Sequence, residues 1–201
     1  MFRPEGLRET LRHALDPPPL DPVRPVPDAV SAAVLAPVLA GGREPRLVFT
    51  RRTETLTRHA GEISFPGGLV DPGERPAAAA LREAEEELGL KPADVELLGA
   101  LPPVHTRVTG ILIMPFVGWL SADPLFAPSP AEIADVLEFP LSDLIERGTE
   151  TWFEHEGRRF HTFVYDMGEA VIWGATARVL RSLIERVAPD ATPQEAARGF
   201  A

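Results

Sequence analysis

The segment over residues 76–88 is the part of this chain whose conformation the sequence determines most strongly. Pro76 suits the first turn of a helix, because a backbone N–H is not needed there. The alanines that follow have the highest helix propensity, and Gly89 is placed for a left-handed C-terminal cap. The sequence therefore predicts a helix that begins at Pro76 and ends before Gly89.

Glutamates crowd the last turns of this helix: Glu83, Glu85, Glu86 and Glu87. The negative end of the helix dipole opposes them there, and like charges three or four residues apart repel by roughly 0.2–0.5 kcal/mol per pair. At about 100° per residue, Glu83, Glu86 and Glu87 lie on one face of the helix, and Glu85 points elsewhere. One interpretation is a solvated acidic face. The other is a site for hard divalent cations, which prefer oxygen ligands.

The residues around these glutamates resemble the signature of the Nudix hydrolase family. The matching positions, in the order and spacing of that signature, are Gly68, Glu74, Arg82, Glu83, Ala84, Glu86, Glu87, Gly89 and Leu90. Ala84 is smaller than the Ile, Leu or Val that is usual at its position. So many matches at fixed spacing favour the metal-site interpretation over the solvated face.

The resemblance implies roles for two groups of these residues. Mg²⁺ or Mn²⁺ would be bound by the side chains of Glu83, Glu86 and Glu87 together with the backbone carbonyl of Gly68. Glu74 and Arg82 would form an ion pair that fixes the preceding loop against the helix. Such a pair contributes little to stability when exposed, so its expected value is the orientation of the ligands.

A second motif lies directly upstream, in VFTRRTETLTRHAGEISFPGG at residues 48–68. Its similarity to the coenzyme A pyrophosphatase branch of the family rests on Thr50, Arg52, Gly61, Phe65, Pro66, Gly67 and Gly68. Thr53 replaces a serine, and Thr57 stands where the branch has a second arginine, with Arg58 next to it. The resemblance implies that Arg52 binds substrate phosphates, with Arg51 and Arg58 as further candidates.

The resemblance implies an enzyme that hydrolyses the pyrophosphate bond of coenzyme A or its derivatives to 3′,5′-ADP and (acyl-)4′-phosphopantetheine. Two alternatives remain open: hydrolysis of ADP-ribose or another nucleoside-diphosphate compound, and a non-catalytic nucleotide sensor. A hydrolase needs a base that takes a proton from the attacking water. Glu132 resembles the loop glutamate that often has this role in the family, and Glu86 or Glu87 is the alternative.

Composition limits the partners of the protein. The 201 residues include no cysteine, so disulfides and thiol chemistry are excluded. A formal charge of −10, with Lys91 as the only lysine, argues against binding to nucleic acid or to an anionic membrane. Composition therefore favours a cytoplasmic protein, and the resemblance implies a small-molecule nucleotide substrate. An N-terminal helix on a proline-rich linker could dock onto a second copy of the chain, so a homodimer is a further hypothesis.

The pattern along the chain predicts an α+β fold, and the resemblance implies a Nudix-like α/β/α sandwich with a mixed sheet between helices. Strands are expected at 30–40, 46–52, 95–101, 111–120, 151–156 and 159–167. A last amphipathic helix is expected at 173–187, and residues 130–148 are expected to be helical or irregular. The expected organisation is an N-terminal helix with a proline-rich linker (1–27), a Nudix domain (28–188) and a flexible tail (189–201).

Overall fold

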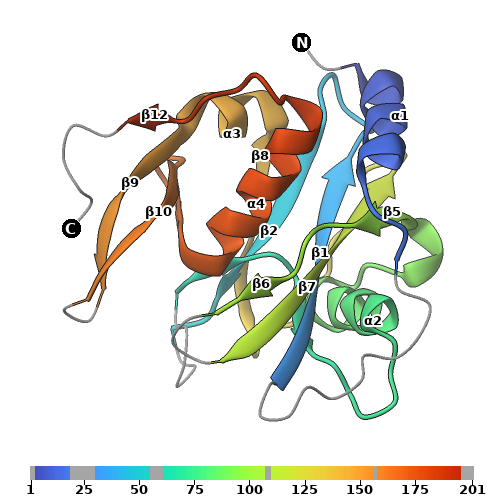
Figure 1. The fold of residues 1–201 in the computed structure, drawn as a ribbon. Coiled ribbons are helices and arrows are strands. Elements are labelled where there is room, and N and C mark those ends of the chain that lie inside the picture. The colour runs from blue at the N-terminus through green and yellow to red at the C-terminus, as the bar shows by residue number, and fades with distance from the viewer. Residues whose placement is uncertain (1–2, 19–29, 55–60, 107–109, 156–157, 196–201) are drawn as a thin grey trace.

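The computed structural model describes residues 3–18, 30–54, 61–106, 110–155 and 158–195. The α-helices are α1 (Pro4–Ala14), α2 (Pro76–Leu88), α3 (Leu141–Arg147) and α4 (Gly174–Val187), and a short 3₁₀ turn spans Pro92–Asp94. None of the described helices is both long and apolar enough to cross a membrane. The strands form two sheets, so the predicted α+β class is confirmed (Figure 1).

The main sheet is mixed and holds the first eight strands. They are β1 (Val30–Leu39), β2 (Arg46–Arg52), β3 (Ile63–Ser64), β4 (Gly67–Leu69), β5 (Glu96–Ala100), β6 (Val104–His105), β7 (Ile111–Leu120) and β8 (Ile133–Pro140). The central strands β1 and β7 pair in parallel along their whole length, and the other pairs are antiparallel.

A second, smaller sheet holds the last four strands: β9 (Gly148–His155), β10 (Arg158–Asp166), β11 (Val171–Ile172) and β12 (Gln194–Glu195). Its centre is the antiparallel pair of β9 and β10. This sheet lies to one side of the main sheet (Figure 1). Residues 194–195 of the expected tail pair with β9, and residues 196–201 lie outside the described part of the chain.

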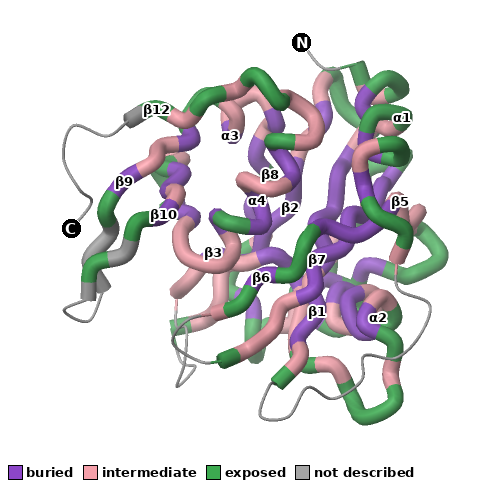
Figure 2. Tube along the Cα trace, in the orientation of Figure 1, coloured by how far each residue is buried: buried purple, intermediate pink, exposed green. Residues whose placement is uncertain are grey.

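Two hydrophobic cores lie on opposite faces of the main sheet, because successive strand residues point to opposite sides. On one face, Leu35 and Val48 pack with Leu88 of α2. On the other face, Phe49 packs with apolar residues of α4 such as Leu180. The central strands are accordingly buried along most of their length (Figure 2). Helix α2 is therefore held against the sheet by its apolar side, and its glutamates lie on the other side of the helix.

Residues 133–140 correct one expectation from the sequence. They form strand β8, which pairs antiparallel with β2, and only α3 is helical within 130–148. Ile133, Leu137 and Phe139 are buried, and exposed residues lie between them. In the sequence, the apolar residues of β8 and α3 together resemble one amphipathic helix. The backbone partners of β8 lie on β2, and a local pattern cannot show such a distant pairing.

Helix α1 packs onto the domain rather than standing apart from it. Its Leu7 and Leu11 are buried in the same core as the apolar face of α4. Arg8 and Arg12 both form ion pairs with Glu96 of β5. Residues 19–27 of the expected linker lie outside the described residues, so the three-part division of the chain and a homodimer formed through its N-terminus stay predictions.

We predict that Leu11→Ala lowers the free energy of unfolding of the whole domain by about 2–4 kcal/mol, because it opens a cavity under α1. Thr10→Ala, an exposed substitution on the same helix, is the matched control and should change it by less than about 0.5 kcal/mol. Urea unfolding followed by circular dichroism measures both. Equal stability of the two variants would mean that α1 does not contribute to the core.

Candidate functional site

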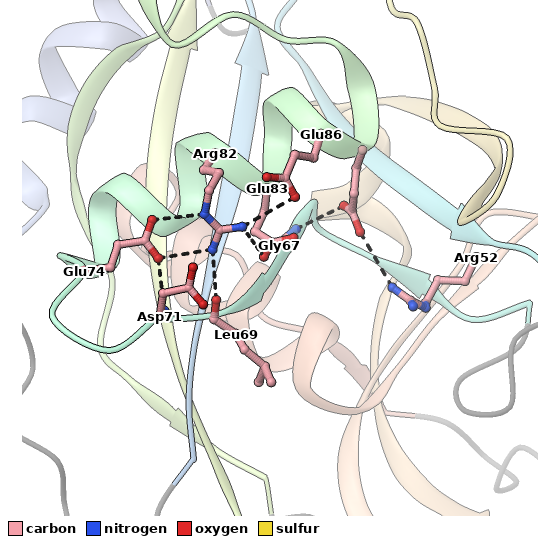
Figure 3. Close-up of polar contacts among 9 residues, drawn as sticks. Arg52, Gly67, Leu69, Asp71, Glu74, Arg82, Glu83 and Glu86 are labelled. Carbon is pink, nitrogen blue, oxygen red and sulfur yellow. Dashed lines mark hydrogen bonds and ion pairs between the residues drawn. The ribbon is translucent and has the colours of Figure 1, made fainter.

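The acidic side of α2 faces the loop that connects β4 to the helix (Figure 3). Along this side, exposure decreases from Glu86 to Glu87: the side chain of Glu86 is 60% exposed, that of Glu83 17% and that of Glu87 4%. Glu85 is exposed and points away from them. The three glutamates that the sequence placed on one face therefore differ sharply in their contact with water.

Glu87 is a buried carboxylate with two different partners. Its Oε2 accepts a hydrogen bond from the backbone N–H of Gly67, at 3.1 Å. Its Oε1 lies 3.6 Å from Nη1 of Arg52. Burial raises the pKa of Glu87 to about 7, and repulsion from Glu83 and Glu132 adds to this, against the hydrogen bond and the arginine. The favourable interaction with the guanidinium of Arg52 therefore does not fully offset the cost of burying the charged carboxylate.

Arg82 connects the acidic face to the preceding loop. Its Nε and Nη2 each donate to one oxygen of Glu74, both at 3.1 Å, so the ion pair implied by the resemblance is present and bidentate. Its Nη2 also donates to the backbone carbonyl of Leu69, at 3.1 Å. The hydrogen bonds to Glu74 raise the pKa of Arg82, and the same bonds lower the pKa of Glu74.

The same guanidinium reaches two of the glutamates that the sequence suggests as metal ligands. Nη1 of Arg82 lies 2.8 Å from Oε1 of Glu83 and 3.5 Å from Oε2 of Glu86. The sequence predicted a partner for Arg82 only in Glu74. Its position one residue before Glu83 and one helical turn before Glu86 was the signal that could have indicated these contacts.

The two glycines of β4 allow the helix to approach the sheet closely. A Cβ on Gly67 would overlap the carbonyl of Ala33 on β1, and a Cβ on Gly68 would overlap the carboxylate of Glu83. A side chain at position 67 would therefore separate β4 from β1, and one at position 68 would displace the carboxylate of Glu83. The glycine pair thus brings the backbone of β4 and the carboxylates of α2 into direct contact.

Glu132 is held by the C-terminus of α2. The N–H groups of Ala127 and Ser129 donate to the last carbonyls of the helix, those of Leu88 and Glu87, at 2.8 and 2.9 Å. The carbonyl of Glu132 in turn accepts from the N–H of Thr53, which follows β2, at 2.9 Å. Glu132 is exposed, and its charge acts on buried Glu87. The loop after β7 therefore places Glu132 close enough to Glu87 for their charges to interact, which sequence spacing could not show.

The two arginine candidates that the structure describes, Arg51 and Arg52, lie in different places. Of these two, Arg52 contacts the acidic face of α2. Arg51 donates from Nη2 to the backbone carbonyl of Glu169, at 2.9 Å, and lines a separate cavity of about 330 Å³ beside Val171 and Trp173. Arg58 lies outside the described residues.

The residues of this face suit a hard divalent cation in chemistry, but their side chains are not gathered around one point. Among the described residues, no three acidic or histidine side chains are close enough together to hold a metal ion. Arg82 and Arg52 instead lie against the carboxylates. All the donors are oxygens, and Glu87 is a buried carboxylate with incomplete compensation, so a divalent cation fits once the arginines move.

We predict a pH-dependent gain in stability for Glu87→Gln in protein kept free of metal by EDTA. Because the folded-state pKa of Glu87 is raised from 4.5 to about 7, its charge costs most above pH 7 and nothing below pH 4.5. The variant should be more stable than the parent by about 1–3 kcal/mol at pH 8, and the difference should disappear near pH 4.5.

Denaturant unfolding at several pH values measures this difference. Glu85→Gln, on the same helix but exposed, is the control and should stay within about 0.5 kcal/mol of the parent at every pH. A variant at position 87 that is less stable than the parent at pH 8 would show that the carboxylate is well compensated without metal.

Comparison with known proteins is consistent with this geometry. The NUDIX domain family matches residues 29–161 of the chain. The Nudix hydrolase NudL of Photorhabdus laumondii is 36% identical over 159 residues, covering 78% of this chain and 84% of its own. NudL of Escherichia coli K12 is 35% identical over 195 residues, covering 91% and 88%.

Among solved structures, a MutT/nudix family protein from Enterococcus faecalis shares the fold with a TM-score of 0.55, at 13% identity, over 94% of this chain and 75% of its own. This likeness concerns the fold alone, and it agrees with the expected Nudix-like architecture. The matched domain and the identity to full-length relatives carry the assignment: the chain belongs to the Nudix hydrolase family of enzymes.

Proposed function

We propose that this protein is a metal-dependent pyrophosphohydrolase that cleaves coenzyme A or its derivatives to 3′,5′-ADP and (acyl-)4′-phosphopantetheine. The observation that supports it best is the contact between Arg52 and Glu87. Arg52 belongs to the upstream motif that resembles the coenzyme A branch, and Glu87 belongs to the Nudix signature. This contact between the two motifs supports a role for both in hydrolysis of a diphosphate.

Each residue of the site has a role in this proposal. The carboxylates of Glu83, Glu86 and Glu87, with the carbonyl of Gly68, would hold Mg²⁺ or Mn²⁺. When bound, the ion would supply neutralisation of the phosphate charge and activation of water. Arg82, fixed by Glu74, keeps the β4 loop and the ligand helix in register.

The reaction needs a proton acceptor and a phosphate clamp. The oxygen of the attacking water forms a bond to one phosphorus, and the bond from that phosphorus to the bridging oxygen breaks, so that the other phosphate leaves. Glu132 takes the proton of the water, with Glu86 as the alternative base. Arg52 donates forked hydrogen bonds to the phosphate oxygens. Arg51, which contacts another element, and Arg58 stay candidates for the remainder of the substrate.

Two other functions compete with this proposal. Hydrolysis of ADP-ribose or another nucleoside-diphosphate compound uses the same acidic face. A nucleotide sensor without catalysis has less need of the complete set Glu83, Glu86 and Glu87, which this chain retains.

We predict that the protein with Mg²⁺ or Mn²⁺ cleaves coenzyme A faster than ADP-ribose, NADH or dinucleoside polyphosphates, with products identified by chromatography. Glu83→Gln should lower kcat/KM for coenzyme A by roughly 100-fold or more, because it removes a metal ligand. Glu85→Gln should leave it unchanged. Cleavage of ADP-ribose but not of coenzyme A would favour the second function, and no cleavage of any compound would favour the sensor.

We predict that Glu132→Gln lowers kcat by about 10²–10⁴-fold at neutral pH, because it removes the proton acceptor. Its affinity for Mn²⁺, measured by calorimetry, should stay within a few-fold of the parent. Asp135→Asn, an exposed carboxylate on the neighbouring strand, is the control for the loss of one negative charge. Turnover by the Glu132 variant within a few-fold of the parent would remove Glu132 from this role and leave Glu86 or Glu87 as the base.

A further inference from the structure

Arg52 is held against Glu87 by charge but not by a complete hydrogen bond. The Nη1 to Oε1 distance of 3.6 Å exceeds the usual limit for an N–H···O hydrogen bond. The Nε of Arg52 is buried, and in the described part of the chain it has no hydrogen-bond partner. The guanidinium therefore lies beside Glu87 with one donor, Nε, that no described residue uses.

The backbone of Arg52 is fixed more firmly than its side chain. Its N–H donates to the carbonyl of Glu62 at 3.1 Å, and its carbonyl accepts from the N–H of Gly61 at 3.2 Å. The pairing of β2 with β8 is irregular between Arg51 and Arg52. The side chain is about one quarter exposed, so its guanidinium has room to move toward solvent while the backbone stays in place.

The charges around Glu87 favour replacement of this arginine by a stronger cation. Glu83 and Glu132 add negative charge near the buried carboxylate, and a single guanidinium faces it at a long distance. A divalent ion at the oxygens of Glu83 and Glu87 would satisfy that charge and would repel the guanidinium. Oε2 of Glu87 already accepts a hydrogen bond from Gly67, so an ion would compete with Arg52 for Oε1.

We propose that Arg52 is an exchangeable counter-ion: metal binding displaces it from Glu87 and frees it to bind the diphosphate of the substrate. The inference rests on the proposed function, and it adds an order of binding, metal before diphosphate. In the metal-free protein, Arg52 neutralises part of the buried charge. After the exchange, its planar donors face the phosphate oxygens, which match them in forked geometry.

Binding measurements on the full-length protein test this exchange without turnover. In Arg52→Gln, Mn²⁺ should bind at least about threefold tighter than in the parent, because its competitor is gone. At saturating Mn²⁺, the analogue imidodiphosphate should bind about tenfold weaker, because the phosphate clamp is gone. Without metal, the parent should bind imidodiphosphate no better than the variant. Titration calorimetry follows both ligands, and the paramagnetic resonance of free Mn²⁺ gives an independent reading of the first.

Two further variants separate the exchange from simpler effects. Arg43→Gln is the control for the loss of one positive charge. Arg43 lies in the exposed turn before β2, so this variant should leave both affinities unchanged. Arg52→Lys keeps the charge but loses the fork, so Mn²⁺ should bind as in the parent and imidodiphosphate more weakly.

Several results would overturn the inference. Weaker or unchanged Mn²⁺ binding in Arg52→Gln would mean that Arg52 positions Glu87 instead of competing for it. Metal-independent binding of imidodiphosphate, or no binding to the parent at all, would equally contradict it. A parent protein that shows the exchange but does not cleave coenzyme A would reject the proposed substrate and leave this inference standing.

Discussion

The site depends on one buried carboxylate, Glu87, at the point where α2 meets the main sheet. Its hydrogen bond to the N–H of Gly67 joins the helix to β4, and the missing side chains of the glycine pair allow that contact. A buried charge is unfavourable unless it is paired, so the fold carries a cost at this position that a cation can relieve. The other contacts of the site are arranged around that requirement.

In this structure, two arginines provide the positive charge that faces the glutamates of α2. Arg82 lies between Glu74 and the glutamates of α2, and Arg52 reaches Glu87 from β2. Arg82 donates two hydrogen bonds to Glu74 and one to the backbone carbonyl of Leu69. Arg52 is held near Glu87 by charge alone, at a longer distance. This difference separates a supporting residue from one that can change partners, and it follows from geometry that sequence spacing does not contain.

Local sequence signals predicted the helix of the site well and its neighbours less well. Pro76 and Gly89 bound α2 as expected, and Gly89 has the left-handed conformation, with φ of 69°. The prediction that residues 130–148 are helical or irregular was wrong for strand β8. Its partner β2 lies about ninety residues earlier in the chain, and no local pattern shows that pairing. The burial of Glu87 and the delivery of Glu132 by the loop that caps α2 depend on the same kind of long-range contact. The motifs predict which residues form the site, and tertiary packing determines how the described ones are buried and paired.

A crystal structure of the full-length protein with Mn²⁺ tests the central claim most directly, because anomalous scattering locates the ion without reference to activity. The account predicts manganese bound by oxygens of Glu83, Glu86 and Glu87 and the carbonyl of Gly68, with Arg82 moved off Glu83 and Arg52 moved off Glu87. Manganese absent from these oxygens at saturating concentration, with both arginines still against the carboxylates, would contradict it.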